Sequence, residues 1–309
     1  MRIIFMGTSS YSVEVCKLII TSGLNIVGVC TKPDGRVGRS KVLTPHPLKE
    51  FALTNGLPVL TPVDLTNGDV LEDFSKLKPD LIVLVGYGLL VPNQIIKLPV
   101  YGCLNIHPSL LPKYRGPSPV SSAILNGDRF TGVSIMLMDE GFDTGPILQQ
   151  KRVEIGTTDT ADNLTSKLFN IGAGMLVDLI PLWTDGSINL TQQDEIQVSY
   201  TQKIVKQDGR IQWNEDAQSI FRKVRAYSPW PGTFSTWRGK NFKLLSVTIN
   251  DLVAKKHLGK LWGSVLDGLY VGTGKGVLEI KNLQIEGKQP VSAKEFMVGY
   301  PDFEKDILI

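Results

Sequence analysis

Residues 81–85, with the sequence LIVLV, are apolar at every position. A strand that packs on one face only alternates apolar and polar residues, whereas an uninterrupted apolar run indicates a strand covered on both faces. Similar short apolar runs at residues 2–6, 26–30 and 101–106 alternate with amphipathic helical stretches. This alternation predicts an α/β fold, with a Rossmann-like, mostly parallel sheet and helices on both of its faces.

The pattern changes after a long helical stretch at residues 160–183. A polar segment at 185–205 follows, and it has the composition of an interdomain linker. Beyond it lie one short helix at 217–226 and several short strands joined by glycine turns, the last of them at the end of the chain. Such a pattern predicts a small C-terminal β-barrel of the OB-like kind. We therefore expect a first domain at residues 1–189, a linker at 190–207 and a barrel at 208–309.

Composition narrows the class of protein further. The 309 residues are 42% hydrophobic and 20% charged, as in ordinary soluble proteins, so disordered and fibrous classes are excluded. The three cysteines are scattered through apolar stretches, which favours a reducing compartment. A strand-like segment directly follows Met1, and no apolar run is long enough for a membrane span. We expect a cytoplasmic protein without a leader, and no membrane partner.

Charge is unevenly distributed along the chain. Residues 1–205 contain 17 Lys and Arg against 19 Asp and Glu, whereas residues 206–309 contain 16 against 11. A basic second part is typical of a domain that contacts a polyanion. An excess of this size is also compatible with a basic domain that has no such partner.

Asn105 and His107 close the apolar run at residues 101–106. Residues two apart on a strand project to the same face, so both side chains are expected in the cleft at the end of this strand. Pro108 then ends the strand. Ligands of open parallel sheets bind at the carboxyl ends of the strands, and an imidazole beside an amide is suited to acid-base chemistry there.

Two further loops lie at strand ends. Gly86 and Tyr87 follow the central strand, with Leu90 shortly after, and the glycines would let a flat ligand lie against the backbone; an ordinary strand-to-helix turn is equally compatible with this spacing. The loop at 138–146 holds three carboxylates, of which Asp143 is expected to face His107. No Cys and His cluster is present in the sequence, and we expect no metal site.

Together these motifs resemble the folate-dependent N-formyltransferases over essentially the whole chain. The resemblance rests on Asn105-x-His107 with the following Ser-Leu-Leu-Pro and Tyr-Arg-Gly, on the segment 139–145 (DEGFDTG), and on the opening 5–8 (FMGT). It implies that Asn105, His107 and Asp143 are the catalytic residues, with 10-formyltetrahydrofolate as the formyl donor and no metal. It also implies that the donor binds along a segment formed by Ser109, Leu110, Leu111 and Pro112.

The implied chemistry suits these residue types. An amine that attacks a formyl carbon passes through a tetrahedral intermediate whose oxyanion needs preorganised donors, and Asn105 and His107 can supply them. Asp143, by accepting a hydrogen bond from His107, would fix the tautomer of the imidazole and allow it to carry the proton. The chain departs from the family pattern beside this cleft, at Ser9, Tyr11, Ser12 and Ser118.

Within the resemblance, the acceptor amine is that of initiator methionyl-tRNA, for translation initiation. A glycine-containing loop at residues 31–41 carries four cations that suit phosphate contacts, and the helix at 217–226 extends the basic track onto the barrel, which is then the tRNA-contacting domain. We expect Trp230 and Trp237 to be core residues, and the chain to be a monomer. The predicted tRNA-binding residues are Lys32, Arg36, Arg39, Lys41, Arg222 and Lys223.

Two other functions remain open from the sequence. The first is formyl transfer to a small amine, either a ribonucleotide, which would not need residues past about 205, or a nucleotide-sugar. The second is a catalytically idle tRNA-binding module. The trio of Asn105, His107 and Asp143 argues against the second, because a protein that only binds tRNA has no use for it.

Overall fold

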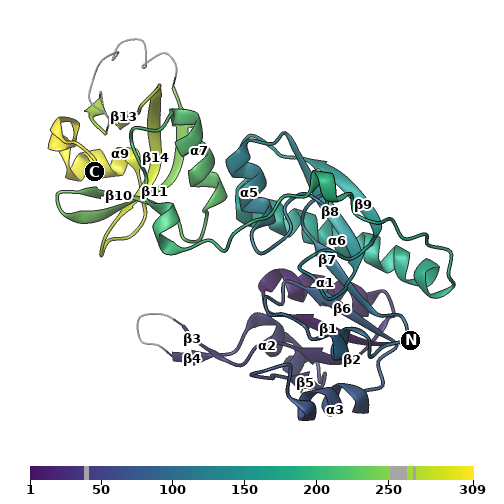
Figure 1. Ribbon diagram of the computed structural model, residues 1–309. Helices are drawn as coiled ribbons and strands as arrows, with labels where there is room; N and C mark the ends of the chain where they lie inside the picture. The colour runs from purple at the N-terminus through teal and green to yellow at the C-terminus, as the bar shows by residue number, and fades with distance from the viewer. Residues whose placement is uncertain (38–41, 251–262, 267–268) are drawn as a thin grey trace. The chain divides into compact units, whose positions relative to one another are not determined.

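The computed structural model describes residues 1–37, 42–250, 263–266 and 269–309, which form two compact units. Unit 1 comprises Met1–Pro119, Phe130–Glu154 and Thr165–Gln202. Unit 2 comprises Val120–Arg129, Ile155–Leu164 and Lys203–Ile309. Figure 1 labels the helices and strands of both units.

A seven-stranded sheet with the order β5-β2-β1-β6-β7-β8-β9 forms the centre of unit 1. The five strands from β5 to β7 pair in parallel, as predicted, while β8 and β9 are added antiparallel at one edge. A separate hairpin, β3 with β4, carries part of the basic loop. The strands are β1 (Arg2–Gly7), β2 (Asn25–Cys30), β3 (Gly35–Val37), β4 (Val42–Thr44), β5 (Val59–Leu60), β6 (Leu81–Val85), β7 (Cys103–His107), β8 (Phe130–Leu137) and β9 (Ile147–Glu154).

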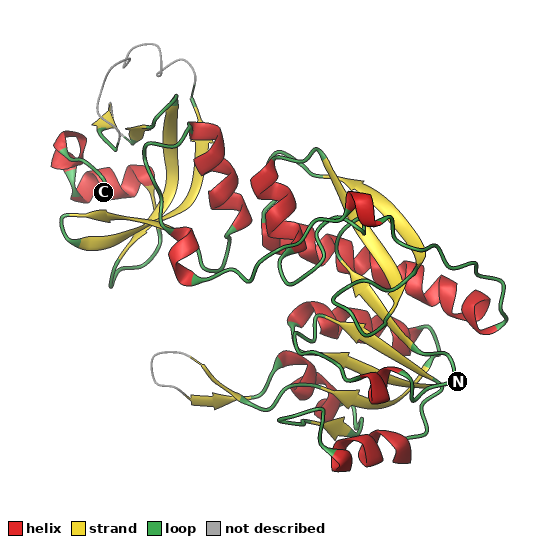
Figure 2. Cartoon of the chain, viewed as in Figure 1, coloured by secondary structure: helices red, strands yellow, loops and turns green. Residues whose placement is uncertain are grey.

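Helices cover both faces of this sheet (Figure 2). Ile4 and Met6 of β1 pack with Phe74 and Ile95 on one side, and the alternation of a strand turns Ile3 to the other side. Helices α1 and α2 contact each other, and so do α3 and α4. The helices are α1 (Ser10–Thr21), α2 (Pro47–Thr54), α3 (Gly68–Lys76), α4 (Asn93–Ile96), α5 (Pro119–Asn126) and α6 (Ala161–Thr184), with α5 and the start of α6 grouped into unit 2.

Unit 2 is built on an antiparallel sheet with the order β10-β11-β14-β13-β12, to which β15 adds by pairing with β14. The helix predicted at 217–226 is present as α7. The further elements of unit 2 are η2 (Lys206–Gly209), α7 (Ala217–Ala226), β10 (Thr233–Trp237), β11 (Lys240–Ile249), β12 (Val265–Leu266), β13 (Tyr270–Gly272), β14 (Val277–Ile285), β15 (Val291–Ser292), α9 (Ala293–Gly299) and η3 (Pro301–Lys305). The short helix η1 (Glu195–Gln197) precedes them in the chain and belongs to unit 1.

The end of the chain differs from the strand that the sequence predicts. Residues 293–299 form α9 and residues 301–305 form η3, and a capping box of Ser292 and Glu295 starts α9. The last residues nevertheless hydrogen-bond as a strand does: Ile309 exchanges two backbone bonds with Thr236 of β10, and the Leu308 N–H donates to the Gly263 carbonyl at 2.8 Å. Residues 306–309 thus bridge the two edges of the sheet and complete a small barrel.

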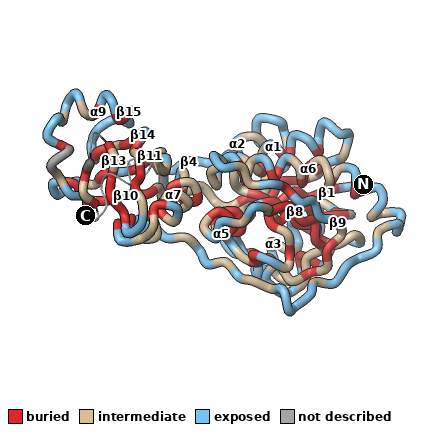
Figure 3. Tube along the Cα trace, turned by 90° about the horizontal axis from the view of Figure 1, so that it is seen from above, coloured by how far each residue is buried: buried red, intermediate tan, exposed pale blue. Residues whose placement is uncertain are grey.

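An aromatic cluster fills this barrel (Figure 3 shows the buried residues in red). Trp237 is buried and meets Phe242, Phe296 and Phe303 edge-on, with ring centroids 5.3–6.3 Å apart. The prediction that Trp230 is also a core residue is wrong, since this side chain is 59% exposed. The reason is its position in the loop between α7 and β10, outside the alternating pattern that turns Trp237 inward.

Hydrogen bonds from the β8 and β9 strands fix the loop that follows β7. The buried Ser134 hydroxyl donates to the Ser109 carbonyl at 2.6 Å and accepts from the Leu111 N–H at 3.1 Å. Gln150 of β9 donates to the same hydroxyl and to the Leu111 carbonyl, both at 2.8 Å. This bracing holds the backbone of residues 109–111 against the sheet.

No helix in the described part of the chain is long and apolar enough to cross a membrane. The three cysteines are free and buried. Burial raises the pKa of the Cys16 and Cys30 thiols to about 12 and raises the pKa of Cys103 as well.

These raised pKa values predict inert thiols. At about pH 8, Ellman's reagent should label none of the three cysteines in the folded protein and all three in denaturant, because only an accessible thiolate reacts. Rapid labelling of the native protein would contradict the buried positions.

Substitution Ser134→Ala should destabilise the protein without unfolding it. The change leaves the Leu111 N–H without its acceptor in a buried place, which costs about 1–3 kcal/mol in the free energy of unfolding. Urea denaturation measures the loss. The matched control is Ser75→Ala on α3, whose hydroxyl makes one exposed bond within its own helix, and it should leave the midpoint almost unchanged.

Candidate active site

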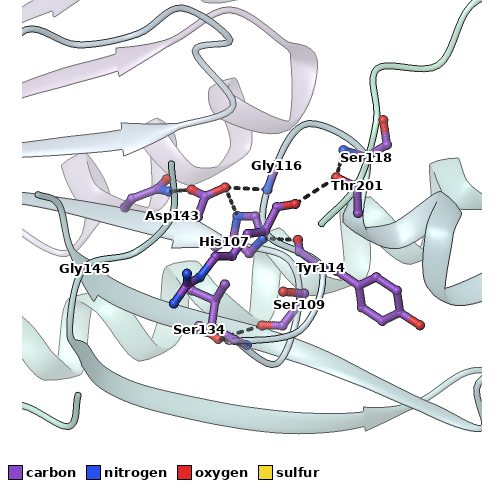
Figure 4. Close-up of polar contacts among 12 residues, drawn as sticks. His107, Ser109, Tyr114, Gly116, Ser118, Ser134, Asp143, Gly145 and Thr201 are labelled. Carbon is purple, nitrogen blue, oxygen red and sulfur yellow. Dashed lines mark hydrogen bonds and ion pairs between the residues drawn. The ribbon is translucent and has the colours of Figure 1, made fainter. Parts of the chain in front are cut away.

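Asn105 and His107 lie on β7, which is flanked by β6 and β8 in the interior of the sheet. Both point to one face of the strand, as their spacing predicts. The side chains are well buried, with 6% of Asn105 and 4% of His107 exposed. Because His107 is the last residue of the strand, its ring lies where loops from other strands meet it (Figure 4).

The two ring nitrogens of His107 face two different oxygens. Nε2 lies 3.0 Å from the Tyr114 carbonyl oxygen. A carbonyl only accepts, so Nε2 must carry the hydrogen. Nδ1 lies 3.6 Å from Oδ2 of Asp143, which is an ion-pair distance but too long for a hydrogen bond. The Tyr114 carbonyl, rather than Asp143, therefore fixes the tautomer, and it leaves Nδ1 as the basic nitrogen.

Asp143 is held by the backbone and by Asn105. Its Oδ2 accepts from the Gly116 N–H at 2.8 Å, and its Oδ1 accepts a longer bond of 3.5 Å from the Asn105 amide. The residue has a φ of 56°, in the left-handed region, where a side chain other than glycine is strained. The structure thus brings the three residues together, with the carboxylate facing the ring as predicted.

The loop after β7 turns most of its side chains inward. Ser109 is buried and its hydroxyl donates to the Lys113 carbonyl at 2.7 Å. Leu111 packs against Met136 and Ile147, while Leu110 and Pro112 are half-buried. A role for this segment in binding the donor remains a prediction. Because Ser109 and Leu111 are buried, we expect Leu110, Pro112 and the backbone to make the contacts.

The turn after β6 has both a buried and an exposed side. Gly86 adopts a positive φ of 58°, and its carbonyl accepts from the Thr8 hydroxyl at 2.8 Å. Tyr87 is buried against Cys30, and burial raises the pKa of its hydroxyl. Leu90, by contrast, is 61% exposed. Of the three predicted binding residues in this turn, only Leu90 presents its side chain to solvent.

A hollow of about 630 Å³ borders the loop that precedes Asp143. None of Asn105, His107 and Asp143 lines it. The residues around the hollow include Asn93, Lys97, Tyr101, Asp139, Glu140 and Trp183.

Among the described residues, no group of three or more His, Cys, Asp or Glu is placed to hold a metal ion.

The predicted basic residues fall on separate elements. Lys32 donates to the Gly88 carbonyl at 3.1 Å, and Arg36 lies on β3, whereas Arg39 and Lys41 lie outside the described residues. On α7, Arg222 is half-buried and Lys223 forms an ion pair with Glu215. The charge of Lys223 is therefore partly neutralised within its own unit.

Three of the departures from the family pattern have local structural roles. The Ser9 side chain caps α1 by accepting from the Ser12 N–H, the Ser12 hydroxyl donates to the Val85 carbonyl at 2.7 Å, and the Tyr11 ring lies 5.9 Å from that of Phe169. The bond of Ser118 to the Thr201 hydroxyl, at 3.1 Å, comes from its backbone N–H and does not depend on the serine side chain.

Sequence patterns did not reveal the contacts that Arg115, a residue of the Tyr-Arg-Gly motif, makes near this site. Arg115 is only 1% exposed, and its guanidinium is paired with Gln193 and Glu195 from the segment predicted as a linker. The polar, aperiodic sequence of that segment gives no sign of these contacts. The signal that could have indicated these contacts was the arginine inside a predicted active-site motif, because a buried charge requires a partner.

The chain matches known proteins over nearly all of its length. Residues 1–180 match the family described as "Formyl transferase", and residues 203–301 match "Formyl transferase, C-terminal domain". A protein of Chloroflexus aggregans named methionyl-tRNA formyltransferase is 41% identical over 300 residues, which are 97% of each chain. One of the same name from Caldicellulosiruptor saccharolyticus is 39% identical over 312 residues, covering 100% of both chains.

Solved structures show the same fold at lower identity. HypX from Aquifex aeolicus, in complex with tetrahydrofolic acid, has a TM-score of 0.65 at 20% identity, covering 99% of this chain and 48% of that one. An N-formyltransferase from Helicobacter canadensis, in complex with folinic acid and dTDP-3-aminofucose, has a TM-score of 0.66 at 19% identity, covering 90% and 98%. By its two domain matches and its full-length relatives, this chain belongs to the formyl transferase family.

Proposed function

We propose that this enzyme transfers the formyl group of 10-formyltetrahydrofolate to the α-amino group of initiator methionyl-tRNA, with Asn105, His107 and Asp143 as its catalytic residues. The observation that carries this assignment is the convergence of these three side chains at the end of β7. The names of the full-length relatives support the acceptor, and the folate in a structural neighbour supports the class of donor.

Formyl transfer passes through an oxyanion that needs a hydrogen-bond donor. The amine nitrogen attacks the formyl carbon and forms a new C–N bond, while the carbonyl electron pair moves to oxygen. The Asn105 amide, buried on β7 two residues before His107, is the group that donates to this oxyanion, and one such donor is worth roughly 2.7–4 kcal/mol. The carbonyl then re-forms, and the bond from carbon to the donor nitrogen breaks.

Proton transfer falls to Nδ1 of His107. The Tyr114 carbonyl retains the hydrogen on Nε2, so Nδ1 is free to take the proton that the amine loses and to return it to the leaving nitrogen. Asp143 faces Nδ1 and stabilises the imidazolium between these two steps. The 3.6 Å separation can become a hydrogen bond only after Nδ1 has taken the proton, because a bare Nδ1 and a carboxylate oxygen are both acceptors.

The donor is placed by the turns on either side of these residues. We assign its binding to the exposed Leu90, the backbone at Gly86 and Tyr87, and the loop from Ser109 through Leu110 and Leu111 to Pro112. Both loops follow strands adjacent in the sheet, so their backbones approach the same ligand edge.

Positively charged side chains position the acceptor, methionyl-tRNA. We assign phosphate contacts to Lys32, Arg36, Arg39 and Lys41 and to α7 of the C-terminal part, where the sequence is basic. We also propose that the protein acts in the cytoplasm, as a monomer.

The variant His107→Ala tests the mechanism. It should lower kcat at least about a hundredfold, as expected for the loss of acid-base catalysis, and leave the affinity for methionyl-tRNA unchanged. The assay supplies 10-formyltetrahydrofolate with charged initiator tRNA and weighs the product by mass spectrometry. His46→Ala, which changes the residue before α2, is the matched control and should keep kcat within about twofold.

Two results would contradict this assignment. An unchanged kcat in His107→Ala would show that the imidazole is only structural. Formylation of a nucleotide-sugar or ribonucleotide amine in place of methionyl-tRNA would move the enzyme to the small-amine class.

Replacing Lys32, Arg36, Arg39 and Lys41 together by Gln should weaken tRNA binding and flatten its dependence on salt. Each phosphate contact that is lost lowers the log–log slope by roughly 0.7–0.9, because fewer counterions are released. Fluorescence titrations between low and physiological salt measure this slope.

A control with the same loss of charge separates a local effect from a global one. It replaces four lysines of α1, α3, β9 and α6 by Gln, namely Lys17, Lys76, Lys151 and Lys167. The salt dependence of its tRNA binding should stay closer to that of the unmodified protein. Equal slopes in both quadruple variants would rule out the loop as a phosphate site.

A further inference from the structure

We propose that residues 191–201, here called the strap, hold in place the two oxygens that face His107, and that Gln193 and Ser199 are positioning residues for formyl transfer. The proposal rests on the proposed role of His107 and Asp143. It assigns a function to a segment whose sequence predicts only a linker.

Backbone hydrogen bonds attach both ends of the strap to other segments of unit 1. Thr191 exchanges two bonds with Ile147 of β9, at 2.8 and 2.9 Å. At the other end the Thr201 N–H donates to the Arg115 carbonyl at 2.8 Å, and its hydroxyl donates to the same oxygen (Figure 4). The strap is therefore fixed at two points that flank the site.

Gln193 fixes the turn that carries Asp143. Its Nε2 donates to the Asp143 carbonyl at 2.8 Å and to the Gly145 carbonyl at 2.7 Å, which uses both amide hydrogens. Gly145 has no space for a side chain, since a Cβ there would lie 1.8 Å from the Leu137 carbonyl oxygen. With Asp143 in a left-handed conformation, the turn needs such outside support to keep its shape.

Ser199 fixes the peptide group whose carbonyl faces His107. The Arg115 N–H donates to the Ser199 carbonyl at 2.9 Å. In a trans peptide the N–H and the C=O point in opposite directions, so this bond aims the Tyr114 carbonyl away from the strap and toward Nε2. The Ser199 hydroxyl also accepts from the Tyr114 N–H at 2.9 Å, and Tyr114 has a φ of 62°.

Arg115 links the two halves of this arrangement. Its Nε donates to Oε1 of Gln193 at 3.0 Å, and its two terminal nitrogens bind the Glu195 carboxylate at 2.7 and 3.3 Å. A movement of Gln193 therefore disturbs both the Asp143 turn and the loop of Tyr114. Because the guanidinium is buried, Arg115→Ala is expected to impair folding, and the tests use Gln193 instead.

Two substitutions of Gln193 separate its donor role from its size. Gln193→Glu keeps the shape and the contact with Arg115 but presents oxygens to two carbonyls, while Gln193→Met removes every polar contact. Each should lower kcat roughly ten- to hundredfold, since displacements of about 1 Å have such effects, and leave KM for both substrates nearly unchanged. Ser199→Ala should lower kcat less, because the carbonyl of residue 199 is retained.

The matched control lies in the same strap. Gln197 donates only to Asp194, an exposed neighbour three residues away, so Gln197→Glu introduces the same charge without touching the site. It should keep kcat. If Gln193→Glu also keeps its kcat, Gln193 has no positioning role and the proposal is wrong.

An NMR measurement tests the proposal independently of the reaction. The ¹⁵N and ¹H signals of the His107 ring should move in Gln193→Glu and Gln193→Met and stay in place in Gln197→Glu. If they move while the unmodified enzyme formylates no tRNA, the strap is supported and the proposed function fails. If kcat falls only in step with the folded fraction and the ring signals do not move, the strap has a purely structural role and the proposal is overturned.

Discussion

The imidazole of His107 lies between two oxygen atoms that come from different loops. The Tyr114 carbonyl holds the hydrogen of Nε2, and the Asp143 carboxylate faces Nδ1. A carbonyl cannot donate, so this arrangement decides which nitrogen is basic before any substrate arrives. These two contacts give three parts of the structure their importance: the strand that presents His107, the turn that presents Asp143 and the strap that supports both.

The supporting contacts matter more for geometry than for stability. A single hydrogen bond such as those of Gln193 contributes only about 0.5–1.5 kcal/mol to the free energy of unfolding, yet a shift of about 1 Å in a catalytic group can cost roughly a hundredfold in rate. Two strained residues, Tyr114 and Asp143, sit next to the ring. Their left-handed conformations persist because surrounding hydrogen bonds fix the neighbouring peptide groups.

The sequence predicted what local periodicity controls. Alternation along a strand placed Asn105 and His107 on one face, and uninterrupted apolar residues placed β6 inside the sheet. It was wrong about Trp230, because a loop residue follows no period. It also could not reveal that Tyr114 fixes the tautomer or that Gln193 reaches Asp143, since these contacts join a side chain to distant backbone and leave no pattern in a polar segment.

The most direct test is to measure which ring nitrogen of His107 carries the hydrogen. Long-range ¹H–¹⁵N correlation spectra distinguish a protonated from an unprotonated ring nitrogen, and at about pH 9 an ordinary imidazole is neutral. The His107→Ala variant assigns the signals. We expect a hydrogen on Nε2 and a bare Nδ1. A hydrogen on Nδ1, with Nε2 unprotonated, would contradict this expectation, because the Tyr114 carbonyl would then face a lone pair and the proton route through Nδ1 would be closed.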